Sequence, residues 1–387
     1  MGVFVISSTL NYLDRNLLNV LAPLIMAELH FNQTSLGWII SAFSVAYAAS
    51  SLLTGWFLDR AGINRGITAA VGWWSAAAVS TGLVASFGGL ALARAALGVG
   101  ESAGIPAVGK LNGTYLKPEE RALGAAVNQI GLSAASLLLP FFIGIAAAHT
   151  WRMPFVVTGC FGFAWIALWL IVSRLIPPPF QADRPVIQRS SRSILRDRSL
   201  LLLVFANVLW MGAYSLWSNW TSLYLIHVHH ITLQQSAKYI WIPPMVSNLG
   251  GFFGGWLSLR WMKRNVDPLA ARRRAVWVSA LGSLVTFLLP FAPDAGWATA
   301  VISISFFFAL AGSVNIYALP IDLYGAGQAG LALAALTCGF GILQTVISPV
   351  IGFLGDHNLY SQVIWIATIP LIFSAWVLQR ITPLRTA

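Results

Sequence analysis

Long apolar runs are the feature that most constrains how this chain can fold. Of its 387 residues, 57% are hydrophobic and only 9% are charged, and the mean hydropathy is +0.74. A soluble domain would carry roughly 25% charged residues. Each run reaches about 20 residues, which is the length a helix needs to cross a bilayer. Because backbone polar groups in hydrocarbon must pair within their own element, long runs predict an all-α membrane protein surrounded by lipid.

The runs predict twelve transmembrane helices in two sets of six. We expect the spans at residues 2–28, 35–58, 67–87, 90–115, 121–148, 152–174, 199–228, 236–261, 272–292, 296–322, 327–355 and 360–380. The longest polar connection, which contains Pro177-Pro178-Pro179, lies between the two sets. The predicted domains are therefore an N-terminal six-helix bundle at 1–175, a cytoplasmic linker at 176–198 and a C-terminal six-helix bundle at 199–387.

A weak internal repeat indicates that the two halves are related. The segment Gly55-Trp56-Phe57-Leu58-Asp59-Arg60 recurs 200 residues later as Gly255-Trp256-Leu257-Ser258-Leu259-Arg260. Each copy closes the second helix of its half. Two pseudo-symmetric bundles around a site at the membrane midplane are typical of secondary transporters.

The basic residues predict the orientation of the chain. If the first span starts in the cytoplasm, 18 of the 23 Lys and Arg fall in cytoplasmic connections or in the C-terminal tail. That bias is the positive-inside pattern of membrane proteins. We therefore expect a multi-pass protein of the cell (inner or plasma) membrane with both termini in the cytoplasm. The net charge of +11 then reflects orientation and secondary contact with anionic membrane lipid, and does not indicate a nucleic-acid partner.

Other residue patterns argue against an enzyme. No metal-ligand spacing, phosphate-binding loop or nucleophile–base pair is apparent, so we expect no cofactor and no metal. Both cysteines, Cys160 and Cys338, lie within apolar runs and are expected to be free, buried thiols. We expect the chain to be monomeric.

Charged side chains deep inside a span are costly and usually have a function. Five stand out here, namely Asp14, Arg15, Arg94, Glu101 and Lys110. Arg94 and Glu101 are seven residues apart and therefore share one helix face. On the first span, Asn11, Arg15 and Asn19 recur every four residues and form a polar stripe.

Two interpretations of these charges remain open. The first is a buried salt-bridge network that only ties helices together, although apolar replacements are often as stable. The second is proton coupling, in which a buried carboxylate takes up a proton when its arginine partner is engaged elsewhere. The planar donor fork of Arg15 suits a substrate carboxylate.

The segment Gly55-x-x-x-Asp59-Arg60-x-Gly62-x-x-Arg65 resembles the signature of the major facilitator superfamily in the loop after the second helix. The resemblance implies the major facilitator fold and a gating role for these five residues. In the second half, Leu259 stands where Asp59 stands in the first. The second latch is therefore expected to be weaker or differently paired.

Two further segments resemble the anion:cation symporter family of that superfamily, which includes bacterial hexuronate and D-galactonate transporters, sialin and vesicular glutamate carriers. They are Asn11-Tyr12-Leu13-Asp14-Arg15, and Arg94-x-x-x-Gly98-x-Gly100-Glu101 followed by Pro106. The resemblance implies proton-driven symport of a small organic anion such as a sugar acid. It also implies that Asp14 and Glu101 carry protons with Arg94 as their partner, that Arg15 binds the substrate carboxylate, and that Tyr47 lines the site.

Further polar residues are weaker candidates for the substrate site, namely Asn11, Asn128, Lys110, Gln344 and Trp220. Hydrogen bonding between helices, or anchoring of a tryptophan at the lipid interface, explains such residues about equally well. Thr337 and Cys338 stand where that family usually carries asparagines, which leaves the substrate open. A drug or anion exporter, a uniporter, and less readily a receptor or membrane enzyme remain as alternatives.

Overall fold

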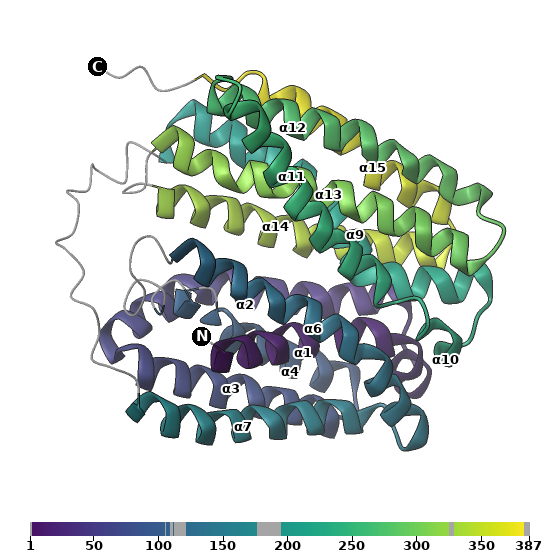
Figure 1. The fold of residues 1–387 in the computed structure, drawn as a ribbon. Helices are drawn as coiled ribbons and strands as arrows, with labels where there is room; N and C mark the ends of the chain where they lie inside the picture. The colour runs from purple at the N-terminus through teal and green to yellow at the C-terminus, as the bar shows by residue number, and fades with distance from the viewer. Residues whose placement is uncertain are drawn as a thin grey trace. The chain divides into compact units, whose positions relative to one another are not determined.

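A computed structural model describes residues 2–104, 106–108, 111, 121–175, 195–324 and 329–382, and all regular elements in these ranges are helices (Figure 1). Contacts between residues divide the chain into two compact units. The helices of the first unit are α1 (Gly2–Leu29), α2 (Gln33–Ala61), α3 (Ile63–Leu83), α4 (Phe87–Glu101), α6 (Arg121–Ala148), α7 (Arg152–Leu175) and the short α10 (Leu233–Ser236). The second unit is built from α9 (Arg198–His229), α11 (Ile242–Met262), α12 (Pro268–Gly282), the 3-10 helix η2 (Ser283–Phe291), α13 (Ala295–Tyr324), most of α14 (Ala329–Asp356) and α15 (Tyr360–Leu378).

Each span expected from the sequence coincides with a helical segment of the described residues. By length and composition alone, six of these segments are long and apolar enough to cross a membrane. They are α7, α9, α12 with η2, α13, α14 from Leu331, and α15. Helix α1 is equally long but carries Asn11, Asp14 and Arg15, whose polar side chains lower its hydropathy.

The fourth span is interrupted, although the sequence predicts one continuous helix at 90–115. Helix α4 ends at Glu101, well before the expected end at residue 115, and Ser102 and Ala103 form a turn before helical residues resume at Gly104. Pro106 has no backbone N–H to donate to the carbonyl of Ser102, so one hydrogen bond of the helical ladder is missing at this point. The break places Glu101 at a helix terminus inside the unit.

Four helix pairings recur in the two units. In the first unit, α2 packs against α4, α3 packs against α4 and α7, and α1 packs against α7. In the second, α11 packs against α13, α12 packs against α13 and α15, and α9 packs against α15. In both units the second helix therefore meets the fourth, the third meets the fourth and sixth, and the first meets the sixth. This recurrence matches the internal repeat of the sequence.

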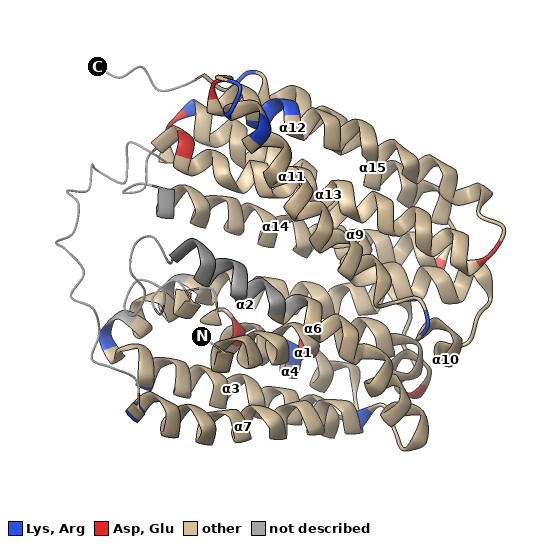
Figure 2. Cartoon of the chain, viewed as in Figure 1, with Lys and Arg blue, Asp and Glu red and all other residues tan. Residues whose placement is uncertain are grey.

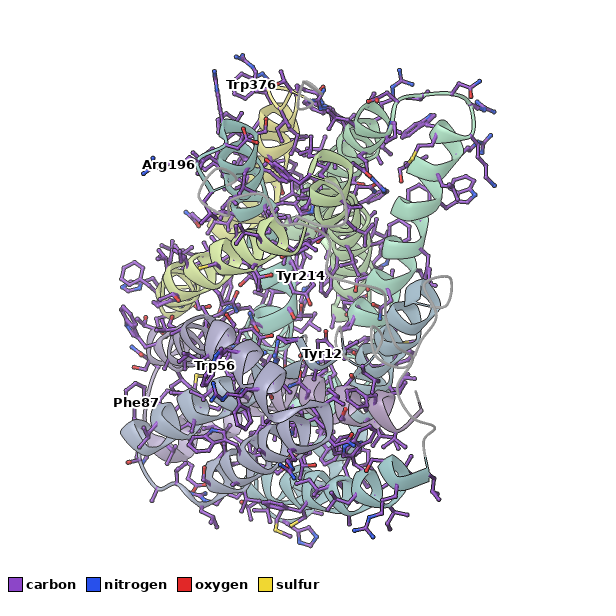
Figure 3. All side chains as sticks on the ribbon, turned by 90° about the vertical axis from the view of Figure 1, so that its left-hand side faces the viewer. Tyr12, Trp56, Phe87, Arg196, Tyr214 and Trp376 are labelled. Carbon is purple, nitrogen blue, oxygen red and sulfur yellow. The ribbon has the colours of Figure 1, made fainter. Side chains whose placement is uncertain are left out.

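The outer surfaces of the helices are apolar and aromatic. Trp56 on α2, Phe87 on α4 and Trp376 on α15 are exposed large side chains (Figure 3). Charged residues gather at helix ends, with few along the middle of the helices (Figure 2). Such a surface fits hydrocarbon as the surrounding solvent.

The expectation of buried thiols is wrong. Cys160 and Cys338 are free, as expected, but both are exposed on the helix surface. Apolar runs in a membrane protein include residues that face lipid as well as residues that face the interior, and the sequence pattern does not separate the two.

An ionic cluster ties the end of α1 to the start of α7. The Glu28 carboxylate accepts a hydrogen bond from the Trp151 indole at 2.7 Å and forms an ion pair with Arg152. Arg152 also donates to the carbonyl of Val84, after the end of α3. The cluster therefore fixes three helix ends of the first unit relative to one another.

Helices α11 and α13 approach each other closely at a glycine. A Cβ atom placed on Gly254 would clash with the backbone carbonyl of Ala311, whereas a Cβ on the adjacent Gly255 would meet nothing within 4 Å. The side-chain amide of Asn315 bridges the same place, donating to the carbonyls of Gly254 at 3.0 Å and Ala311 at 2.9 Å. Only a residue without a Cβ allows this contact.

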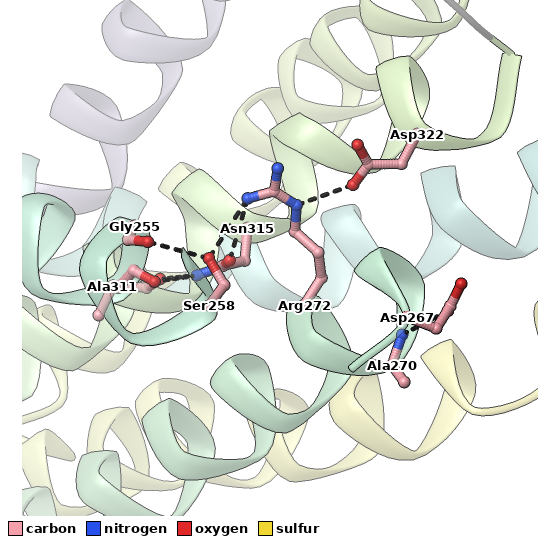
Figure 4. A network of polar contacts seen from close by, with 9 residues as sticks. Gly255, Ser258, Asp267, Ala270, Arg272, Ala311, Asn315 and Asp322 are labelled. Atoms are coloured by element: carbon pink, nitrogen blue, oxygen red, sulfur yellow. Dashed lines mark hydrogen bonds and ion pairs between the residues drawn. The ribbon is translucent and has the colours of Figure 1, made fainter. Parts of the chain in front are cut away.

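A second polar network joins α11, α12 and α13 (Figure 4). Arg272 donates through Nε to the Asp322 carboxylate at 2.8 Å. Its Nη1 lies 3.4 Å from the Ser258 hydroxyl and 3.5 Å from the Asn315 side-chain oxygen. Asp322 is therefore the carboxylate of this network. The second half thus pairs its charges through Arg272 and Asp322, while Leu259 replaces the acid of the first-half motif.

Substitution of Gly254 tests the close helix contact. Gly254→Ala is expected to lower the free energy of unfolding of the purified protein by about 1–3 kcal/mol, because the new methyl group forces α11 and α13 apart. The matched control is Gly255→Ala, which adds the same group one residue away into open space. Thermal unfolding in detergent compares the two. Equal midpoints for both variants would contradict the contact.

The Arg272–Asp322 pair is tested by a double-mutant cycle. Both side chains are about one-fifth exposed, so Arg272→Gln is expected to cost about 1 kcal/mol of stability. Asp322→Asn should cost a similar amount, and the double variant less than the sum of the two. Arg274→Gln, which removes an exposed arginine of the same helix, serves as the control. Additive effects in the double variant would show that the two charges do not interact.

Candidate functional site

Helix α1 carries its polar residues into the interior of the first unit. Asp14 is only 1% exposed and Asn11 is 9% exposed. Both lie on α1 among buried leucines. The side chain of Arg15 is 29% exposed. Buried charges are stable only when they are paired and hydrogen-bonded, so the partners of these side chains define the site.

Glu101 forms an ion pair with Arg15. The Glu101 side chain is fully buried, and its Oε2 atom accepts a hydrogen bond from Arg15 Nε at 2.5 Å. The other carboxylate oxygen, Oε1, has no hydrogen-bond partner among the described residues. The pair joins α1 to the end of α4 and leaves half of the carboxylate available to another donor.

Aromatic rings surround the Arg15 guanidinium. Its Cζ atom lies 4.8 Å from the ring centre of Tyr47, 5.1 Å from that of Phe43 and 5.9 Å from that of Tyr12. Phe43 and Tyr47 are themselves stacked on α2. Ring faces attract a cation and hold the guanidinium plane without using its N–H donors. Such ring contacts do not occupy the guanidinium donors that do not bond Glu101.

Arg94 is held differently. Only 2% exposed, it donates from Nη1 to the backbone carbonyl of Asp14 at 3.0 Å and lies over the Phe43 ring. The Asp14 carboxylate interacts with the side chain of Thr158 on α7 and lies within electrostatic range of Arg94 and Glu101. Two acids and two arginines thus share one interior region, and their formal charges cancel.

A cavity of about 50 Å³ adjoins the ion pair within the first unit. Asn11, Arg15, Tyr47 and Glu101 line it together with residues of α1, α3 and the segment after α4. Four of the residues expected in the site therefore face one common space.

The remaining expected residues lie elsewhere or outside the described part of the chain. In the second unit, Trp220 is 3% exposed and Gln344 is 8% exposed, and each has a buried polar atom without a partner among the described residues. Lys110 lies outside the described residues, as does the side chain of Asn128 on α6. The structure therefore does not assign a position to these two side chains.

The expected gating motif lies where α2 meets α3. Gly62 is the only residue between the two helices and has φ +78°, a conformation that favours glycine. Arg60 lies over the Trp56 ring at 5.7 Å, and Arg260 repeats this contact with Trp256 at 5.3 Å. Gly55 has open space beside it and Arg65 is exposed, while the side chain of Asp59 lies outside the described residues.

Phe43 and Trp74 lie beside the charged residues, although no sequence pattern predicts this. Phe43 lies against both arginines, and Trp74 lines the cavity. Aromatic residues on apolar helices are so common in this chain that no local signal distinguishes these two. Thr158 also lies close to Asp14, and no sequence pattern predicts this contact.

Comparison with known proteins places the chain in a family. Residues 4–319 match the model of the Major Facilitator Superfamily. The hexuronate transporter of Escherichia coli K12 is 25% identical over 98% of this chain and 93% of its own length. The galacturonate transporter of Dickeya chrysanthemi is 27% identical over 79% and 95%, and a probable sulfoacetate transporter of Cupriavidus necator is 29% identical over 92% and 87%.

Solved structures agree with this fold. A D-xylose-proton symporter superposes with a TM-score of 0.76 at 12% identity, covering 98% of this chain and 97% of its own. An inward-facing, unoccupied bacterial homologue of the human lysosomal transporter Spinster gives a TM-score of 0.74 at 17% identity, covering 97% and 93%. The expected major facilitator fold and the resemblance to sugar-acid transporters are both confirmed. The chain belongs to the major facilitator superfamily and is a multi-pass membrane transporter, not an enzyme.

Proposed function

We propose that this transporter carries a small organic anion, such as a hexuronate or aldonate, together with a proton. The observation that carries the proposal is the ion pair between Arg15, which is partly exposed, and Glu101, which is fully buried. An arginine that holds a buried acid can instead hold a substrate carboxylate. The binding of anion and proton then becomes one coupled event.

The coupling follows from the cost of burying charge. When a substrate carboxylate engages Arg15, Glu101 loses its direct cationic partner. A buried carboxylate without such a partner is more stable in its neutral form, so it takes up a proton. The loaded site then holds one anion and one added proton, and its net charge is unchanged. Release of the substrate returns Arg15 to Glu101, which gives up the proton.

Asp14 and Arg94 also take part in the proposed coupling. Arg94 is bonded to the α1 backbone and stays in place through the cycle, where it limits the negative charge around both acids. Asp14 is a second proton site, since it lies within electrostatic range of Glu101. Proton occupancy of one acid therefore influences the other.

The substrate class is proposed from relatives and from the site. The relatives are named for hexuronate, galacturonate, sulfoacetate, and galactarate or D-glucarate, all of which carry at least one anionic group. The Arg15 fork suits such a group in a bidentate contact. Thermal-shift screening against uronates, aldonates, aldarates, sulfonates, aromatic acids and amino acids identifies the ligand.

The proposal also covers the membrane orientation and the oligomeric state of the chain. The positive-inside bias supports cytoplasmic termini, a cytoplasmic linker at 176–198 between bundles at 1–175 and 199–387, and insertion in the cell membrane. We propose that the monomer is the transporting unit. Labelling of single introduced cysteines from either side of sealed vesicles tests the orientation.

The role of Arg15 is tested with lysine. Arg15→Lys keeps the positive charge but loses the planar fork and the ring contacts, so substrate affinity should fall by about 1–3 kcal/mol. Isothermal titration with the ligand found by screening measures the change. Arg274→Lys, at an exposed site of the second unit, is the matched control and should bind like the wild type. Unchanged affinity in Arg15→Lys would remove Arg15 from the substrate site.

The coupling role of Glu101 is tested with glutamine. Glu101→Gln mimics the protonated acid, so it should bind and exchange substrate in counterflow but should not accumulate it against a gradient. The matched control is Glu28→Gln, which removes the carboxylate at the end of α1 beside Arg152. This variant should keep proton-driven accumulation. If Glu101 only tied helices together, counterflow and accumulation would fall in proportion. Accumulation at the wild-type level in both Glu101→Gln and Asp14→Asn would reject proton coupling and favour a uniporter.

A further inference from the structure

The cavity beside the Arg15–Glu101 pair extends along the axis of the first unit. Its lining on α1 runs from Phe4 to Arg15, which is about 16 Å at the rise of an α-helix. On α3 the lining residues are Ile67 and Trp74, seven residues apart. The cavity therefore has one end at the ion pair and the other near the start of α1.

The residues after α4 indicate the same direction for the long axis of the cavity. Glu101, Gly104 and Val108 line the cavity in order, and α4 runs opposite to α3 after the short connection at 84–86. Val108 therefore lies toward the end where Ile67 and Phe4 stand, and Glu101 lies toward Trp74. The close approach of Gly100 to Trp74 supports this placement of Glu101, since a Cβ on Gly100 would meet Trp74 at 2.9 Å. Three apolar side chains thus form the far end of the cavity and the ion pair forms the near end.

Three buried polar atoms of the lining lack partners among the described residues. They are Asn11 Nδ2, Trp74 Nε1 and Glu101 Oε1. The three residues are 9%, 2% and 0% exposed. Two of the atoms are donors and one is a charged acceptor, so a ligand that satisfies all three must both accept and donate hydrogen bonds. Buried polar groups of this kind are normally satisfied.

Water fits these requirements in size and chemistry. A cavity of about 50 Å³ has room for roughly three to five water molecules, since each needs about 10–15 Å³ of such a cavity. The Ser7 hydroxyl donates to the Phe4 carbonyl at 2.9 Å, which leaves its oxygen able to accept from a water. The polar wall from Ser7 to Asn11 and Glu101 therefore offers contacts along the length of the cavity.

We propose that this cavity holds a chain of ordered waters that conducts protons between Glu101 and the end of the unit where α1 begins, with Asn11 and Trp74 as positioning residues. The proposal rests on the proposed proton coupling and adds the route by which the proton reaches Glu101. In each transfer one O–H bond of a protonated water breaks and one O–H bond forms on the next oxygen. In the last transfer Glu101 Oε1 gains the proton and neutral water remains. Trp74 and Asn11 donate to water oxygens and hold them in line, without changing protonation themselves.

Gly104 allows the cavity to be filled. A Cβ on Gly104 would meet only Asn11 Nδ2, at 3.9 Å, so a side chain there extends into the cavity without striking the backbone. Gly104→Val should displace water, and Trp74→Phe removes one donor while keeping an aromatic ring. The matched control is Gly144→Val on α6, where a Cβ meets nothing within 4 Å.

The experiment compares three rates in proteoliposomes with the screened substrate. These are counterflow at equal pH, uptake driven by a pH gradient, and proton entry reported by a trapped pH dye. Gly104→Val and Trp74→Phe should slow proton-driven uptake and proton entry by about tenfold or more, and should slow both of these rates more than they slow counterflow. In heavy water both variants should slow further than the wild type, because proton transfer then limits the rate.

The outcomes separate the two proposals. If wild-type protein shows no proton-driven uptake, the proposed coupling fails and the water chain fails with it. If the wild type accumulates substrate, Glu101→Gln does not, and both cavity variants behave like the wild type, only the water chain is overturned. A loss of counterflow and affinity in both cavity variants, with Gly144→Val unaffected, also overturns it, because the cavity then belongs to the substrate site.

Discussion

The ion pair between Arg15 and Glu101 is the interaction on which the first unit depends. A fully buried carboxylate stays ionised only beside a cation, so the ion pair holds α1 against the end of α4. The neighbouring helices are arranged around this requirement. Phe43 on α2 lies against both arginines, and the backbone of α4 approaches α2 so closely that a Cβ on Gly98 would strike the Phe43 carbonyl. Three helices are thus positioned by one buried charge and its partners.

The two units share their helix pairing but differ in their interiors. In the described residues, buried acids and arginines in the middle of helices occur only in the first unit. In the second unit the charges of the Arg272–Asp322 pair lie near helix ends, and the interior is polar through amides, hydroxyls and indoles such as Asn207, Trp217 and Gln344. In the described residues the two units therefore differ in interior chemistry, with buried charges in one and neutral hydrogen-bonding groups in the other. The weak internal repeat in the sequence agrees with shared architecture and divergent content.

The sequence predicted the helices well because membrane burial is a property of whole segments. Each expected span coincides with a helical segment, often within a few residues. The end of α4 was missed because it depends on one absent N–H at Pro106 and on a turn at Ser102, which hydropathy does not register. The pairing of charges was also beyond the sequence. A spacing of seven residues places Arg94 and Glu101 on one face, yet Glu101 pairs with Arg15, and the hydrogen bond of Arg94 goes to the backbone of Asp14. Spacing decides which residues share a face, while partners depend on how neighbouring helices pack.

This division between the arginines reconciles the two interpretations that the sequence left open. Arg94 is almost completely buried and bonded to a backbone carbonyl that cannot move away, so it has the character of a structural tie. Arg15 is partly exposed, is cradled by rings that leave its donors available, and holds a side chain that can rotate. Only an ion pair such as Arg15–Glu101 can be broken and re-formed without unfolding the helices around it. A network that contains one fixed and one exchangeable arginine can stabilise the bundle and respond to an anion at the same time.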